Sequence, residues 1–146
     1  VVAQCGTALT DTQADMLKRH VDEVVLCLDN DSAGEVAMDR AAQKLLPRGL
    51  KVEMLLAPQG CDPADILYAK GEQAVLQWSR TETRNILDIC IDEFTHTPIH
   101  NPYLRRAALH KLQLYLSLID DVLRKLYIDK CISICPLLSA NDLVQE

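Results

Sequence analysis

The chain has 146 residues, of which 49% are hydrophobic and 25% charged, and its formal net charge is −6. This length suits one ordinary domain, or one domain with an appendage, and the composition excludes a disordered chain. No apolar run approaches the ~20 residues that a transmembrane helix needs, so we expect no membrane partner.

The negative charge bears on nucleic-acid binding, which usually shows as a basic patch. The basic clusters here are short, and we interpret them as solvated helix faces: Lys18-Arg19-His20, Arg105-Arg106 and Arg124-Lys125. If the protein meets nucleic acid, most of the basic surface is expected outside these clusters.

Six cysteines form no CxxC pair, which favours reduced thiols and a cytoplasmic location. Four of them lie among apolar residues and are expected to act as small hydrophobes: Cys5, Cys27, Cys90 and Cys131. A zinc site from Cys131, Cys135, His96 and His100 fits no common ligand spacing. The chain opens within a strand-like run and without a signal peptide, so we expect a fragment of something longer.

The first half alternates strand and helix signals. Strands are expected at Val1 to Gln4, within Val21 to Leu28, and at Leu50 to Ala57. Helices are expected after Thr10, which forms a capping box with Gln13, from Ala33 to Leu46, and from Pro63 to Gly71 with Asp62 as N-cap.

This order predicts an α/β fold, a parallel sheet with flanking helices. Ligands of such sheets bind beyond the carboxyl ends of the strands. Topology therefore predicts that Gly6, Asp29, Asp31 and Asp62 lie along one sheet edge.

From Glu82 onward the pattern predicts a small all-helical part. Helices are expected at Arg84 to Phe94, Tyr103 to Leu118 and Asp121 to Ile134, with Asn101-Pro102 starting the middle one. Tyr115 and Tyr127 in this part, and Trp78 before it, are expected to pack rather than bind ligands.

Asp29-Asn30-Asp31-Ser32-Ala33-Gly34 follows the apolar run Val24 to Leu28, which we interpret as a buried strand. As a plain turn, its side chains would cap the next helix. An EF-hand is excluded because its fifth and twelfth positions would be Ala33 and Arg40. A receiver domain would need a phosphoacceptor aspartate and a lysine at separate strand ends. Neither the adjacent aspartates nor the absence of a suitable lysine at the third strand supports this alternative. The remaining hypothesis is a Mg²⁺ (or Mn²⁺) site for phosphoryl transfer, in which Gly34 allows a close backbone turn.

Four segments carry a family resemblance. Val1 to Thr10 resembles the VVA…GTALT segment of bacterial DnaG-type DNA primases. Asp22 to Gly34 is similar to their DEVVLCFDGDAAG, and Leu56 to Asp65 to their LPEGKDPDD. The tail Leu126 to Cys131 also resembles the end of the primase polymerase core.

The resemblance implies an incomplete TOPRIM-type sheet over residues 1–80 and the helical subdomain of the primase core over 81–146. It implies that Asp29 and Asp31 are catalytic residues and metal ligands and that Asp62 is a third ligand. Gly6, Thr7 and Gly34 would contact substrate. The second aspartate of the family's DPD pair is replaced by Ala64, with Asp65 one place later.

The implied activity is nucleotidyl transfer: RNA primer synthesis from ribonucleoside triphosphates on single-stranded DNA during replication. The family's catalytic glutamate, in an EGYMD segment, does not occur in this sequence, so the chain alone is expected to be inactive. The zinc-binding domain and the helicase-binding domain, through which the replicative helicase would be a partner, also lie outside it. Alternatives are another TOPRIM protein, such as a nuclease, and a non-catalytic interaction module.

Overall fold

The computed structural model describes residues 2–3, 8–28, 31–55, 63–98 and 100–144. The chain divides into two compact units, unit 1 (Val1–Asn85) and unit 2 (Ile86–Glu146). No helix in the described ranges is long and apolar enough to span a membrane. The predicted assignment of residues 1–80 and 81–146 to two domains stays a prediction.

Unit 1 begins with helix α1 (Asp11–His20), whose start is the predicted capping box. The Thr10 hydroxyl accepts from the Gln13 N–H at 3.2 Å, and the Gln13 side chain accepts from the Thr10 N–H at 2.9 Å. The strand predicted before it is absent from Val2 and Ala3, while Val1 and Gln4 lie outside the described residues.

Within the residues that the structure describes, the sheet has three strands in the order β1 (Glu23–Leu26), β2 (Lys51–Leu55) and β3 (Thr83–Asn85). β1 and β2 are parallel, as predicted, with Glu23 opposite Lys51 and Leu26 opposite Met54. β3 is antiparallel to β2 and was not predicted. β3 has only three residues of mixed polarity, so its sequence shows no alternating strand pattern. Its strand conformation depends on the backbone partners that β2 provides.

The prediction of a buried strand over Val24 to Leu28 is wrong for these residues. β1 is the outer strand of the described sheet, and Val25 remains 45% exposed. Cys27 is exposed rather than packed as a small hydrophobe, whereas Cys90 and Cys131 are buried as expected. Cys5 lies outside the described residues.

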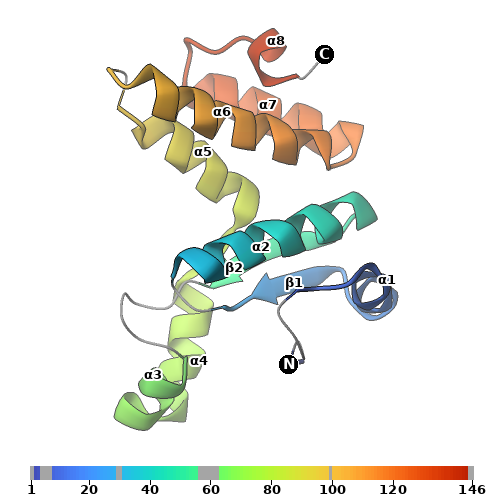
Figure 1. Cartoon of the computed structure of the whole chain (residues 1–146), viewed down its shortest axis with the longest axis vertical. Coiled ribbons are helices and arrows are strands. Elements are labelled where there is room, and N and C mark those ends of the chain that lie inside the picture. The colour runs from blue at the N-terminus through green and yellow to red at the C-terminus, as the bar shows by residue number, and fades with distance from the viewer. Residues whose placement is uncertain (1, 4–7, 29–30, 56–62, 99, 145–146) are drawn as a thin grey trace. The chain divides into compact units, whose positions relative to one another are not determined.

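Helix α2 (Ser32–Leu45) packs on β2 and continues into a 3-10 turn, η1 (Leu46–Arg48). Figure 1 shows α2 lying along the two parallel strands. Its inward face is fully buried at Met38, Ala42 and Leu45, as is Val52 of β2. Burying these side chains is the main favourable contribution to the packing of helix on sheet.

Charged contacts join α1 to the end of α2. Arg48 donates through Nε to Asp15 Oδ1 at 2.6 Å and forms an ion pair with Asp11 at 3.2 Å. Lys44 also reaches Asp11, at 3.2 Å. The Lys44 hydrogen bond and charge, assisted by Arg48, lower the pKa of the Asp11 carboxyl below its ordinary value.

Two helices end unit 1, α3 (Pro63–Lys70) and α4 (Glu72–Thr81). Gly71 separates them with φ of 80° and ψ of 175°, a conformation that is nearly restricted to glycine. The predicted helix end at Gly71 is confirmed, but α4 was not predicted.

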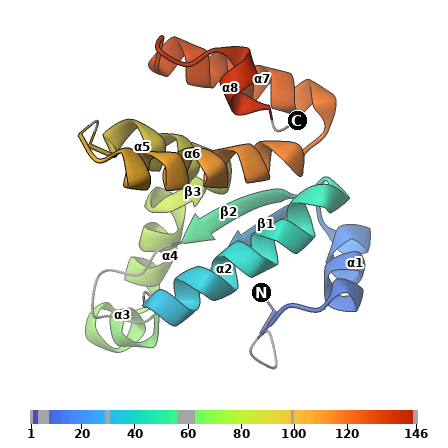
Figure 2. The same ribbon diagram turned by 45° about the horizontal axis from the view of Figure 1, so that its top comes forward.

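Unit 2 contains α5 (Ile86–His96), α6 (Pro102–Ser117), α7 (Asp121–Ile134) and α8 (Ala140–Leu143). Figure 2 shows α5 and α6 side by side, and α8 contacts both α6 and α7. Asn101 caps α6 as predicted, and α7 has the predicted bounds. α5 starts two residues later than expected because β3 takes Arg84 and Asn85, and α8 was not predicted.

The core of unit 2 is apolar. The buried set confirms that Tyr115 packs in the interior. Burial raises the pKa of the Cys131 thiol to about 11, so this cysteine is an unreactive core residue. The other core side chains include Phe94, Leu112, Leu116 and Leu143.

Candidate functional site

Asp31 is the predicted catalytic residue that the structure describes. It is the N-cap of α2, and its Oδ1 accepts from the Gly34 N–H at 2.7 Å. Asp31 therefore caps the helix, which is the role expected of it if the segment is a plain turn. A carboxylate has about four acceptor positions on two oxygens, so capping leaves room for a cation.

Asp31 lies at the edge that topology predicted. β1 and β2 run parallel and end at matched positions, so the segments that follow them leave the same edge of the sheet. Asp31 follows β1 by five residues, and its side chain is exposed at the start of α2. The carboxylate is accessible to a ligand from solvent.

Gly34 lies inside the first turn of α2, and its backbone is buried. It has no positive φ, so the close backbone turn predicted for it stays a prediction and requires no left-handed conformation. Its contribution is the N–H that orients Asp31. The helix starts at Ser32, one residue earlier than predicted, because Asp31 completes the cap.

The other predicted site residues lie outside the described residues: Gly6, Thr7, Asp29 and Asp62. Asp65 is described and is exposed in the first turn of α3, after Ala64. Across residues 8–28, 31–55, 63–98 and the rest of the described part, no three His, Cys, Asp or Glu side chains form a group that could hold a metal ion. The predicted ligand set therefore stays a prediction.

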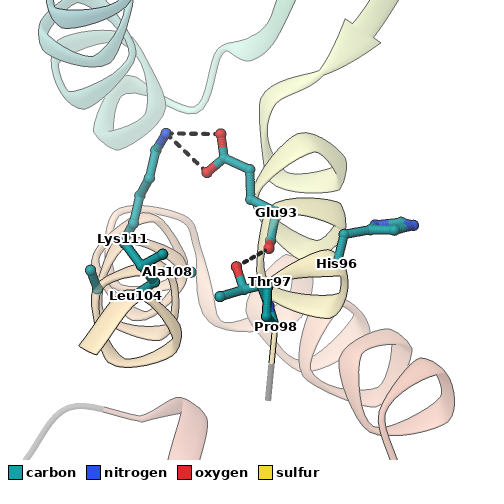
Figure 3. A pocket seen from close by; sticks show the side chains of 8 residues that line it. Glu93, His96, Thr97, Pro98, Leu104, Ala108 and Lys111 are labelled. Carbon is teal, nitrogen blue, oxygen red and sulfur yellow. Dashed lines mark hydrogen bonds and ion pairs between the residues drawn. The ribbon is translucent and has the colours of Figure 1, made fainter. Parts of the chain in front are cut away.

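A recess in unit 2 was not predicted. It has a volume of about 500 Å³ and lies between α5 and α6. Lys111 and Glu93 line the recess and form an ion pair at 3.2 Å. Figure 3 shows this pair, and it shows the His96 side chain pointing away from it. Its lining is mainly apolar: Pro98, Leu104, Ala107 and Ala108.

Comparison with known proteins finds similarity to Toprim-like domains and to DNA primases. A Toprim-like family model matches residues 1–67. The DNA primase of Listeria monocytogenes is 32% identical over 127 residues, which cover 86% of this chain and 19% of that protein. The chain is thus similar to DNA primases over most of its length.

Solved primase structures share the fold. The Aquifex aeolicus primase, with its zinc-binding and RNA polymerase domains, superposes with a TM-score of 0.79 at 23% identity, over 93% of this chain and 32% of that one. A DnaG primase catalytic domain bound to single-stranded DNA gives a TM-score of 0.72 at 22% identity, over 93% and 44%. The described sheet and helices thus have the TOPRIM-type fold of a primase core.

The chain is much shorter than the primases that it matches. It spans 12% to 25% of the length of the first four curated relatives. The matched region of the Toprim-like model ends at residue 67, within α3, and therefore contains Asp31 and all of α2.

Proposed function

We propose that this chain is the C-terminal part of the RNA polymerase core of a DNA primase. The complete protein would join ribonucleotides into short RNA primers on single-stranded DNA. The observation that carries the proposal is Asp31, oriented by the cap of α2 at the strand edge, in a chain with a primase-like sequence and fold.

The proposed metal ligands are Asp29, Asp31 and Asp62, with Mg²⁺ or Mn²⁺ as the ion. The donor set fits a hard cation, because carboxylate oxygens are its preferred protein ligands. When bound, the ion would neutralise charge on nucleotide phosphates. This chain's own contribution is orientation, since the Gly34 N–H fixes one oxygen of Asp31.

The proposed substrates are ribonucleoside triphosphates and a single-stranded DNA template. Gly6 and Thr7 are the proposed contacts with substrate, and Gly34, which is buried, is proposed to act on substrate through the Asp31 carboxylate that its N–H holds. The template proposal draws on the related catalytic domain that is bound to single-stranded DNA. A replicative helicase and a zinc-binding domain would act through segments outside this chain.

The experiment is RNA primer synthesis on single-stranded DNA by the complete protein that carries this segment. Asp31→Asn is expected to lower the rate by about 100-fold or more, the scale of losing one preorganised electrostatic contact. Asn caps helices as well as Asp does, so the fold should persist. Asp22→Asn, which changes an exposed carboxylate elsewhere in unit 1, is the matched control.

An unchanged rate in Asp31→Asn would contradict the proposal. The chain alone should make no primers, because the family's catalytic glutamate segment is not in this sequence. Primer synthesis by the isolated 146 residues would show that this part of the proposal is wrong.

A further inference from the structure

The acidic residues of this chain are unevenly distributed. Residues 94–119 contain no Asp or Glu, although the chain has 21 of them, and the next longest such run is 40–52. The segment carries Arg105, Arg106 and Lys111, so its formal charge is +3. Since the net charge is −6, the remainder of the chain carries −9.

This segment contains α6, the one α-helix of the described part without an acidic residue. Tyr103, Arg106 and His110 are spaced by three and four residues, so they form a stripe along one helix face. All three side chains are exposed, and the Tyr103 side chain is 85% exposed.

The two other cations of α6 have structural partners. Arg105 lies over the Phe94 ring at 4.4 Å and donates to the Thr97 carbonyl oxygen at 3.3 Å. Lys111 forms an ion pair with Glu93 at 3.2 Å. These contacts hold α6 against α5, and they leave Arg106 as the exposed arginine of the stripe.

The apolar recess adjoins this stripe. Ala107 lies between Tyr103 and His110 on the exposed side of the helix and also lines the recess, together with Leu104. Leu104 and Ala107 thus offer an unstacked base an apolar surface beside the stripe, with Arg106 available to its phosphate.

We propose that the stripe of Tyr103, Arg106 and His110 on α6 is a binding surface for single-stranded nucleic acid. An exposed aromatic ring offers a stacking platform, and an adjacent arginine attracts phosphate. Both groups stand on α6, which carries no acidic residue of its own to repel phosphate. A duplex has no unstacked base to offer Tyr103, so single strands are favoured.

The stripe belongs to unit 2, whereas the proposed metal site belongs to unit 1. The exposed aromatic and cationic groups would suit polyanions in general, and the inference rests on the proposed function only in selecting nucleic acid as the ligand. Its test is performed in EDTA, so it can fail while the metal site stands, and the reverse also holds.

The test measures binding of the whole chain to a fluorescein-labelled dT20 by anisotropy, at several salt concentrations. Tyr103→Ala is expected to weaken binding about fivefold or more. Arg106→Ala is expected to weaken it and to reduce the slope of log K against log salt by about 0.7. Arg106→Lys keeps the charge and should retain that slope.

Two matched controls separate the stripe from general surface effects. Tyr68→Ala removes a tyrosine that is 89% exposed on α3. Lys125→Ala removes an exposed cation of α7, with Asp121 and Asp129 one turn away on either side. Neither change should alter dT20 affinity by more than about twofold, because neither residue lies on the stripe.

Three results would overturn the proposal. The first is dT20 affinity unchanged by Tyr103→Ala and Arg106→Ala in variants with wild-type circular dichroism. The second is an equal loss in Tyr68→Ala and Lys125→Ala. The third is binding of dT20 that is no tighter than binding of a 20-base-pair duplex or of anionic phosphatidylserine vesicles.

Discussion

Asp31 combines a structural role with its proposed chemical one. Its carboxylate caps α2 through the Gly34 N–H, and the same carboxylate is the proposed metal ligand. A substitution at this residue therefore affects both roles unless the new side chain can also cap the helix.

Two substitutions at this residue separate the roles. Asp31→Asn should leave the free energy of unfolding within about 0.5 kcal/mol of wild type, whereas Asp31→Ala should lower it by about 1 kcal/mol through loss of the cap. Urea unfolding followed by circular dichroism measures both. Equal stability of the two variants would show that the cap contributes nothing.

Asp11 gives unit 1 a pH dependence. Its pKa is lowered in the folded chain, first by the Lys44 hydrogen bond, so its ionised form favours the folded state. This stabilisation is present above the ordinary value of 3.8 and is lost as the pH falls through the lower folded value.

We expect wild type to be more stable than Asp11→Asn at pH 7, and the difference to shrink below about pH 4. Urea midpoints for both proteins at pH 7, 5 and 3 measure this change. A difference that stays constant down to pH 3 would contradict the assigned role of Asp11.

At the scale of elements, Gly49 and Gly71, the glycines with positive φ among the described residues, should respond differently to substitution. Gly49 has φ of 69° and ψ of 29°, the left-handed region that Asn tolerates. Gly71, between α3 and α4, has φ of 80° and ψ of 175°, which other residues rarely adopt. A Cβ at Gly71 would meet no atom within 4 Å, so backbone conformation alone sets the cost.

Gly71→Asn should therefore lower the free energy of unfolding by about 1–3 kcal/mol, and Gly49→Asn by less than about 1 kcal/mol. Thermal and urea unfolding of the two variants provide the comparison. A larger loss for Gly49→Asn would reverse the expected order.

Elements with strong local signals could be predicted from the sequence. The Thr10–Gln13 capping box starts α1, and Asn101-Pro102 starts α6, because these residues satisfy helix N–H groups locally. β3 could not be predicted, because a three-residue strand depends on its partner β2. The burial of β1 was misjudged because an apolar run does not show which strands will cover it.

At the scale of the whole molecule, the sheet edge with Asp31 could be predicted because strand order fixes where parallel strands end. The stripe on α6 could not, since Arg105 and Arg106 are neighbours in sequence but have different surroundings. Arg105 stacks on Phe94, whereas Arg106 is exposed beside Tyr103, and only packing distinguishes them.

The most direct test of the central claim locates Mn²⁺ on the chain by NMR. Substoichiometric Mn²⁺ broadens amide signals near its binding site even when affinity is low. We predict selective broadening of Ser32 to Glu35, the first turn of α2, and its loss in Asp31→Asn but not in Asp22→Asn. Broadening that spares this turn, or that persists in Asp31→Asn, would contradict a metal site at Asp31.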